Sequence, residues 1–193
     1  NHRLHCISCP ATFSFSADYR SRYPDEILVP SIGPVSTPNT EKIEKGIFVT
    51  ITGIPGLERL YAEAQALGIK LYSNDIKVVP GSIRALPHII PNQNILFQFA
   101  RSGWSSVWLS MIVGTPLVVP DFDSKDDPEI FFNNRAVEKL GIGIVYHGEP
   151  LTELLRQASK VRQAQAKIRA RILAKWGTLN GTAFCAKIFV DDF

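Results

Sequence analysis

The chain has 193 residues, of which 45% are hydrophobic and 20% are charged, and its formal net charge at pH 7 is +3. This length suits one substantial α/β domain and is short for two. The composition excludes a disordered chain and a fibrous repeat, and the mild positive charge gives no indication of a nucleic-acid partner.

The amino-terminal part of the chain differs from the rest. Residues 23–38 contain several prolines and one short apolar run, a composition typical of a linker. We therefore predict that residues 1–45 hold the end of a preceding domain plus this linker, and that residues 46–193 form a second domain. Because the chain starts with Asn1 rather than Met, we expect an excised fragment or a processed protein.

Strand and helix patterns alternate after the linker. Residues 46–52 are a β-branched run closed by Gly53, and apolar residues at helical spacing follow from Leu57 to Leu67. Further short strands are predicted at residues 69–72, 76–79, 95–99 and 117–119, with a buried helix at residues 105–113.

Short apolar strands that alternate with helices are typical of a parallel sheet covered on both faces. We predict an α/β fold, a Rossmann-like, doubly wound parallel sheet. Such sheets bind ligands beyond the carboxyl ends of their strands. Functional residues are therefore expected in the loops that follow residues 52, 99 and 119.

Two helices are predicted at the carboxyl-terminal end. The apolar face of the first, long helix consists of Leu151, Leu154, Leu155, Ala158, Val161, Gln165, Ile168 and Ile172. A short helix follows at residues 183–190. The basic residues between Arg156 and Lys175 either form a solvated face or make a peripheral contact with an anionic membrane. No apolar stretch reaches the ~20 residues that cross a bilayer.

The segment 101–106, Arg-Ser-Gly-Trp-Ser-Ser, lies between a predicted strand and a predicted helix. A helix start offers main-chain N–H donors and a positive dipole to phosphate. Gly103 permits close approach of the backbone, and Arg101 can bind a diphosphate with two parallel hydrogen bonds. The segment is therefore a candidate phosphate site, although a serine-rich segment is also a common helix cap.

The run from Ser102 to Pro120 resembles the donor-binding signature of GT-B glycosyltransferases, including the plant-type and glucuronosyl enzymes and the bacterial lipid II N-acetylglucosaminyltransferase. The similarity continues through residues 126–143, which look like the acidic loop, Asn and Gly-x-Gly ending of the same family's sugar site. It implies that the chain is a GT-B C-terminal, donor-binding domain.

The resemblance assigns roles to individual residues of the donor site. The diphosphate would be held by Arg101, Ser102, Gly103, Trp104, Ser105, Ser106 and Gly53. The nucleobase would be read at Ile83 and Arg84. Leu109 stands where the plant-type motif has a ribose-binding Glu, and because a leucine cannot hydrogen-bond a ribose, the nucleotide is left open.

At the sugar end, Glu129 and Asn133 match the family's acid and Asn, whereas Ile130 replaces its Gln. Asp126 or Asp127 would substitute. An alternative interpretation is that Asp-Asp-Pro-Glu starts a helix at Pro128, where acidic residues favour the helix dipole.

The resemblance implies transfer of a sugar from a nucleotide diphosphate donor, often a UDP-sugar, to an unknown acceptor, with inversion and without a metal or cofactor. The catalytic base would come from an N-terminal acceptor domain, either missing here or a separate subunit. Three cysteines without a disulfide pattern favour the cytoplasm.

Other hypotheses remain open. A non-catalytic nucleotide-sugar-binding or regulatory module and a GT-B nucleotide-sugar epimerase both fit the fold, whereas an oxidoreductase would need Gly-x-Gly-x-x-Gly after the first strand. Cys6 and Cys9, near His2 and His5, have the spacing of a zinc site, but the polar surroundings favour an irregular segment. Cys185 is expected to be a packed thiol.

Overall fold

The computed structural model describes residues 5–8, 26–33, 37–50 and 57–191. The elements in chain order are β1 (His5–Ser8), β2 (Glu26–Val29), β3 (Gly46–Val49), α2 (Leu57–Ala66), β4 (Lys70–Ser73), β5 (Ile83–Arg84), the 3₁₀ turn η1 (Pro87–Ile89), β6 (Ile95–Phe99), α3 (Trp104–Val113), β7 (Leu117–Pro120), α4 (Pro128–Leu140), β8 (Gly143–Tyr146), α5 (Leu151–Trp176) and α6 (Gly181–Asp191).

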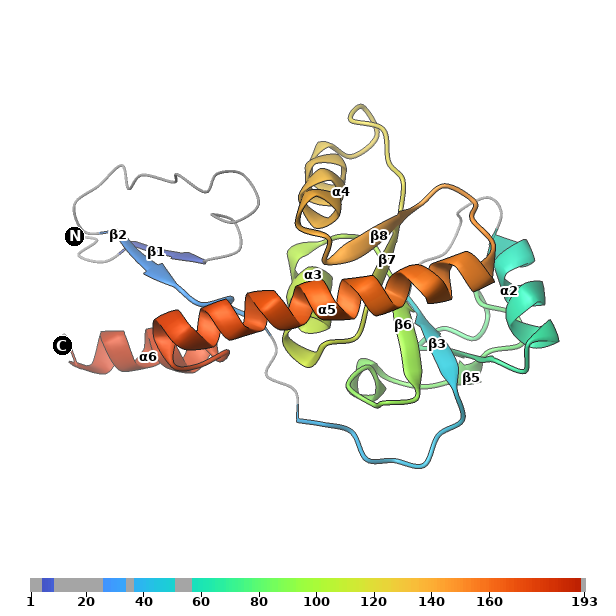
Figure 1. Ribbon diagram of the computed structural model, residues 1–193, viewed down its shortest axis with the longest axis horizontal. Coiled ribbons are helices and arrows are strands. Elements are labelled where there is room, and N and C mark those ends of the chain that lie inside the picture. The colour runs from blue at the N-terminus through green and yellow to red at the C-terminus, as the bar shows by residue number, and fades with distance from the viewer. Residues whose placement is uncertain (1–4, 9–25, 34–36, 51–56, 192–193) are drawn as a thin grey trace.

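The main sheet has six parallel strands in the order β5-β4-β3-β6-β7-β8. The chain starts in the middle at β3, builds one edge through β4 and β5, and then returns to build the other edge through β6, β7 and β8 (Figure 1). This is the doubly wound order of a Rossmann-like fold, so the predicted fold is confirmed.

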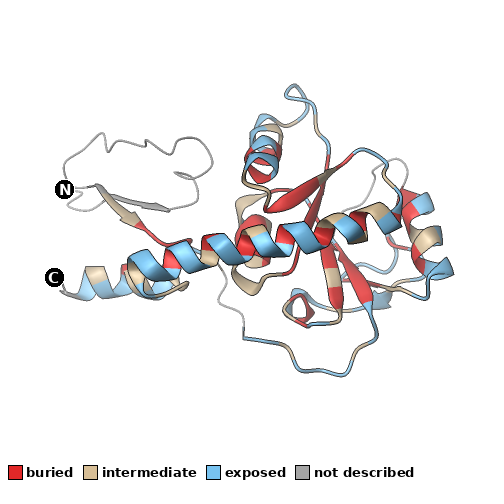
Figure 2. Cartoon of the chain, in the orientation of Figure 1, coloured by how far each residue is buried: buried red, intermediate tan, exposed pale blue. Residues whose placement is uncertain are grey.

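Apart from the exposed edge strand β5, the strands of the main sheet are largely buried, as their apolar composition predicted. Ile47 and Val49 of β3 pack in one cluster with α2 and α5, whereas Phe48 points to the other face and packs with Tyr72 and Ile90. Figure 2 shows the central strands mostly buried, with a half-buried part at Leu96 of β6, and α5 buried only along its inner stripe.

Helix α5 crosses one face of the sheet (Figure 1). Its buried residues are Leu151, Leu154, Ala158, Val161, Gln165, Ile168 and Ile172, which confirms the predicted apolar face except at the half-buried Leu155. Two of its arginines bind main-chain groups of other elements. Arg162 donates to the carbonyl oxygens of residues 95 and 96 in β6, and Arg169 donates to that of residue 111 in α3.

The predicted strand at residues 76–79 is wrong. These residues form a turn, and the side chains of Ile76 and Val78 are exposed. The Asp75 carboxylate accepts the main-chain N–H of Lys77, and the Asp75 carbonyl accepts that of Val79. An Asx turn of this kind competes locally with strand pairing, and the short strand β5 occupies the sheet edge instead.

The segment predicted as a linker contains strand β2, which pairs in parallel with β1 in a separate sheet of two strands. The apolar run of this segment explains why it forms a strand, since Val29 is buried. The Trp176 indole N–H donates to the Leu28 carbonyl at 3.0 Å, and α6 lies against β2. The domain boundary at residue 46 stays a prediction.

The carboxyl-terminal predictions hold. Helix α6 covers the predicted short helix, and Cys185 is buried within it. Across the described ranges, none of the helices has the length and apolar character needed to span a bilayer.

Candidate functional site

The sheet has one switch point, between β3 and β6, where the order of the strands reverses. Open α/β sheets bind ligands beyond the carboxyl edge at such a point. The loop after β6 is residues 100–103, and α3 begins directly after it. The candidate phosphate segment therefore lies at the switch point. Gly53, in the loop after β3, lies outside the described residues.

The turn before α3 is fixed by buried polar contacts. The fully buried Ser102 donates its hydroxyl to Asn134 Oδ1 at 2.6 Å. Asn134 in turn donates to the Pro120 carbonyl at 2.7 Å, and Asn133 donates to the Ser102 carbonyl at 2.9 Å. Two neighbouring side chains of α4 thus hold the β6–α3 turn and the end of β7 together.

Ser102 was predicted to bind the diphosphate and Asn133 to bind the sugar. Both side chains are buried and make hydrogen bonds within the protein. Asn134 was missed by sequence reasoning, although a signal was present: two adjacent asparagines inside a helix have low helix propensity, which indicates that their amides bind other groups.

The start of α3 is open on its outer side. Gly103 is the N-cap, and no side chain in the described ranges caps the helix. A methyl group added at Gly103 would meet no atom of the described residues within 4 Å. Ser105 is exposed and Ser106 is half-buried. No group in the part of the chain that the structure describes accepts the main-chain N–H of Ser105. The main-chain N–H of Ser105 is therefore a donor that a ligand at this helix start could use.

Arg101 brings a positive charge to the same place. Its side chain is 58% exposed, and Nη1 lies 3.8 Å from Asp127 Oδ2. The guanidinium carbon lies 5.0 Å from the centre of the Phe122 ring, a cation–π distance. The guanidinium therefore rests on the loop after β7, at the carboxyl edge of the sheet, and remains accessible.

Asp127 serves as a helix cap. Its carboxylate accepts the Ile130 main-chain N–H at 3.2 Å, and α4 begins at Pro128. The helix-start interpretation of the Asp-Asp-Pro-Glu run is thus confirmed for Asp127. Asp126 and Glu129 are exposed beside it. The structure therefore brings the acidic loop next to Arg101, within the same edge of the sheet.

The aromatic and apolar residues of the motif pack inward. Trp104 stacks on Trp108 with ring centres 4.7 Å apart, and both contact the cluster beneath α3. Leu109 packs against the cluster around Phe48. The packing of α3 therefore depends on these side chains.

The predicted nucleobase residues lie in a different part of the sheet. Ile83 and Arg84 form the exposed edge strand β5 and pair with residues 72 and 73. Three strand spacings separate β5 from β6, or about 14 Å. Ile83 and Arg84 therefore do not contact Arg101, which lies in the loop that follows β6.

The sequence analysis missed a further pair at this edge. His147 Nδ1 lies 3.2 Å from Asp121 Oδ2, and both side chains are exposed. Each residue directly follows the last residue of a strand, β8 and β7 respectively. Since adjacent parallel strands end at the same edge, their position along the chain was the signal that could have found them.

No cluster of three or more His, Cys, Asp and Glu side chains that could hold a metal occurs among the described residues. Cys9 and His2 lie outside those residues, so the spacing of Cys6 and Cys9 stays without a structural account.

Comparisons with known proteins give the fold a context. Neither a protein-family model nor a curated protein sequence matches the chain. Solved structures do. The glycosyltransferase SnogD from Streptomyces nogalater is 16% identical with a TM-score of 0.63, and the match covers 97% of this chain and 56% of that one. The calicheamicin glycosyltransferase CalG4 is 15% identical with a TM-score of 0.65, covering 99% and 52%.

The spinosyn rhamnosyltransferase SpnG, solved with thymidine diphosphate, is 15% identical with a TM-score of 0.60, covering 90% of this chain and 54% of that one. The chain thus spans about half the length of these similar structures. At this level of identity the similarity concerns the fold. The chain has the fold of one half of a GT-B glycosyltransferase, with a six-stranded Rossmann-like sheet and a long C-terminal helix.

Proposed function

We propose that this chain is the donor-binding half of a glycosyltransferase and binds the diphosphate of a nucleotide sugar at the start of α3. The observation that carries the proposal is a combination at the switch point. Within the described part of the chain, the helix start has no side-chain cap, Gly103 has open space beside it, and the guanidinium of Arg101 is exposed. Main-chain donors and a bidentate cation together suit a diphosphate.

In this proposal the residues of the turn divide into two groups. Arg101, Ser105 and Ser106 contact the diphosphate. Ser102 and Asn133 act as positioning residues, because their polar groups hold the turn in place. Trp104 supports α3 by stacking on Trp108. The exposed acids Asp126 and Glu129 are the groups in reach of a sugar beyond the diphosphate.

The chemistry that this site would contribute is electrostatic. When the sugar leaves the donor, negative charge builds up on the departing diphosphate. A fixed guanidinium and helix amides stabilise that charge without reorganising, which lowers the barrier to transfer. We propose inversion without a metal, as in the similar families. The acceptor's base would come from the other half of the enzyme, so the chain alone should bind donor and transfer little sugar.

The donor nucleotide is the finer part of the proposal. SpnG was solved with thymidine diphosphate, which makes a thymidine nucleotide a candidate beside the uridine nucleotide that the motif suggests. Leu109, packed against the Phe48 cluster, offers no hydrogen bond to a ribose. Three cysteines still favour a reducing compartment such as the cytoplasm.

A screen of thermal unfolding with thymidine, uridine and guanosine diphosphates and their sugars tests the proposal. A ligand at about 100 times its Kd stabilises the native state by about 2.7 kcal/mol, which raises the midpoint measurably. If no nucleotide shifts the midpoint, the chain is not a donor-binding domain. If a nucleotide binds but the chain transfers no sugar when combined with its acceptor-binding half, the non-catalytic binding-module alternative is favoured. Leu109, which stands where the plant-type motif has Glu, agrees with that alternative. An epimerised product would identify the epimerase.

A further inference from the structure

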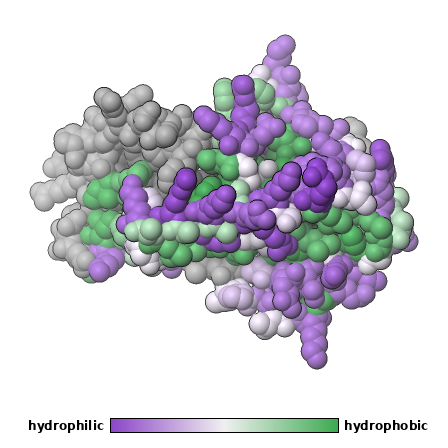
Figure 3. Space-filling view, viewed as in Figure 1, coloured by the Kyte–Doolittle hydropathy of each residue, from purple (hydrophilic) through white to green (hydrophobic). Residues whose placement is uncertain are grey.

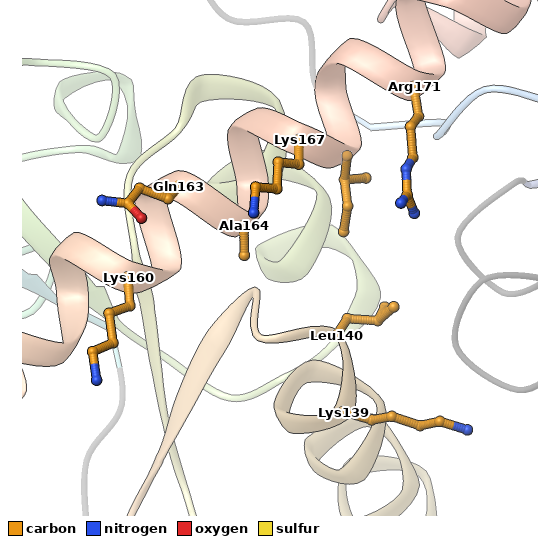
Figure 4. A pocket seen from close by; sticks show the side chains of 8 residues that line it. Lys139, Leu140, Lys160, Gln163, Ala164, Lys167 and Arg171 are labelled. Carbon is orange, nitrogen blue, oxygen red and sulfur yellow. The ribbon is translucent and has the colours of Figure 1, made fainter.

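A groove of about 390 Å³ lies between the end of α4 and the middle of α5. Four of its eight lining side chains are cationic, namely Lys139, Lys160, Lys167 and Arg171, and none is acidic. Figure 4 shows that Lys139 comes from α4 and that the other three come from α5, on the side that faces α4. Opposed cations with no carboxylate among them repel one another, so a bound anion would lower the energy of the site.

The charge of α5 is unbalanced along its whole length. The helix has seven Lys and Arg residues and one acidic residue, Glu153 in its first turn. Figure 3 shows the hydrophilic side chains that follow its outer side. The amphipathic pattern of the helix needs polar residues on this side, but it does not need them to carry one sign.

Four of the seven basic residues have partners within the protein. Arg156 pairs with Glu153, Arg162 and Arg169 bind main-chain carbonyls, and Lys175 lies 4.5 Å from the Trp176 ring centre. The other three, Lys160, Lys167 and Arg171, make no hydrogen bond or salt bridge with any described residue. These three are the α5 cations that line the groove.

The shape of the groove is fixed by the fold. Buried Gln165 on α5 donates to the Ile142 carbonyl, just after α4, at 3.1 Å. A methyl group added at Gly141 would lie 3.7 Å from Ala164 Cβ, so the two elements meet closely at the floor. Leu140, Ala164 and Ile168 form that floor. The backbone that carries the four cations is thus fixed beside a preformed hollow.

The groove is separate from the proposed donor site. Helix α4 starts beside Arg101 at the carboxyl edge of the sheet and ends at the groove. Its 13 residues span about 20 Å at 1.5 Å per residue. An anion in the groove therefore cannot be the diphosphate held at α3.

We infer that this groove is a second anion site, which binds a ligand that carries two or more phosphate groups. Lys160 and Arg171 lie about 16 Å apart along α5 at 1.5 Å per residue, so the cations form a row longer than one phosphate. Four cations balance two phosphate monoesters at about −2 each, and Arg171 supplies a planar fork that suits phosphate.

An acidic peptide fits less well. The walls of the groove are two α-helices, whose main-chain groups are bonded within each helix. An extended peptide would find no strand edge for its own N–H and C=O groups. The ligand is either a soluble polyphosphate compound or a phosphate-bearing lipid headgroup, which share the same chemistry.

The test is calorimetric titration of the full chain with sodium tripolyphosphate at low salt. All proteins carry Arg101→Gln, so that the proposed donor site does not contribute and the two proposals fail separately. The groove variant has Lys160→Gln, Lys167→Gln and Arg171→Gln. The matched control has the same loss of charge at exposed lysines elsewhere, with Lys42→Gln, Lys77→Gln and Lys187→Gln.

The inference predicts that the groove variant binds tripolyphosphate at least about tenfold more weakly, since it loses three of the four cations that would bind the phosphates. The control should stay within about twofold. Lys167→Arg, which keeps the charge, should retain binding. Thermal unfolding of the triple variant, with a midpoint close to that of the control, shows that weaker binding is not a folding defect. Equal weakening in both triple variants, or no binding by the parent, would overturn the inference.

Two further arms identify the source of the ligand. Phosphatidylcholine vesicles with phosphatidylinositol bisphosphate, whose headgroup carries several phosphates, are sedimented with the protein and report a lipid headgroup. Binding of tripolyphosphate alone reports a soluble compound. Either result supports the site when the groove variant abolishes it. Binding of poly-glutamate but not of tripolyphosphate would contradict the phosphate assignment.

Discussion

Ser102 and Asn134 are 32 positions apart in the chain, yet the Ser102 hydroxyl lies 2.6 Å from the Asn134 side-chain oxygen and donates to it. This contact ties the turn before α3 to α4. Because Asn134 also binds the end of β7, the phosphate segment and the acidic loop are parts of one rigid arrangement. The geometry of the candidate site therefore depends on a buried hydrogen bond within the protein.

Ser102→Ala should destabilise the protein by about 1–3 kcal/mol, because it leaves the buried oxygen of Asn134 without its donor. Urea unfolding measures the change. Ser105→Ala is the matched control, since Ser105 is exposed, and its unfolding midpoint should stay close to that of the parent. Equal effects of the two substitutions would show that the buried network does not hold the turn.

Gly103→Ala separates binding from stability. The site has open space for a methyl group and an ordinary φ of −57°, so the free energy of unfolding should fall by less than about 1 kcal/mol. Binding of a nucleotide diphosphate should weaken, because the methyl group would lie where the phosphate approaches the helix start. Unchanged affinity for every nucleotide that binds the parent would place the phosphate elsewhere.

Gly143→Ala, unlike Gly103→Ala, should clearly lower the free energy of unfolding. The added methyl group would collide with Val137 on α4 and lie 2.9 Å from the Leu117 carbonyl oxygen. Overpacking of this kind costs about 1–3 kcal/mol. Thermal unfolding measures the loss. A variant as stable as the parent would mean that α4 can move away from the sheet.

Glu63 makes stability depend on pH. Its carboxylate accepts the Leu151 main-chain N–H at 2.6 Å, at the start of α5, and also binds Arg59. The bond to Leu151, followed by that to Arg59, holds the pKa of Glu63 below its usual value. A lowered pKa in the folded state gives stability that is present above the unfolded pKa, about 4.3, and is lost as the pH falls through the folded value.

Urea unfolding of the parent and of Glu63→Gln checks this sign. The parent should be more stable at pH 7, and the difference should shrink as the pH falls below about 4.3. Glu138→Gln, a change at an exposed carboxylate of α4, serves as the control for loss of charge. A difference that is the same at pH 7 and at pH 3 would show that Glu63 acts without its charge.

Much of the fold could be predicted because its signals are periodic. The apolar runs of β3, β6 and β7 and the stripe of α5 each report burial directly, residue by residue. The run at residues 76–79 has the same composition but became a turn, because Asp75 offers its neighbours local hydrogen bonds. Composition alone does not show which of two competing hydrogen-bond patterns forms.

The candidate site was predictable in place but not in detail. The segment 101–106 could be located because it joins a strand to a helix. The direction of each side chain depends on α4, which is distant in sequence, so Ser102 could not be distinguished from Ser105 as buried or exposed. The same holds for His147 and Asp121, which meet only because β7 and β8 are neighbours.

The most direct test of the donor-site proposal is calorimetric titration of the chain with the nucleotide diphosphates, repeated on Arg101→Gln and Arg135→Gln. Arg135 is the matched control, because it is an exposed arginine that lies over an aromatic ring on α4. The proposal predicts that the parent and Arg135→Gln bind alike and that Arg101→Gln binds at least about tenfold more weakly. Equal binding by all three proteins, or binding by none, would contradict it.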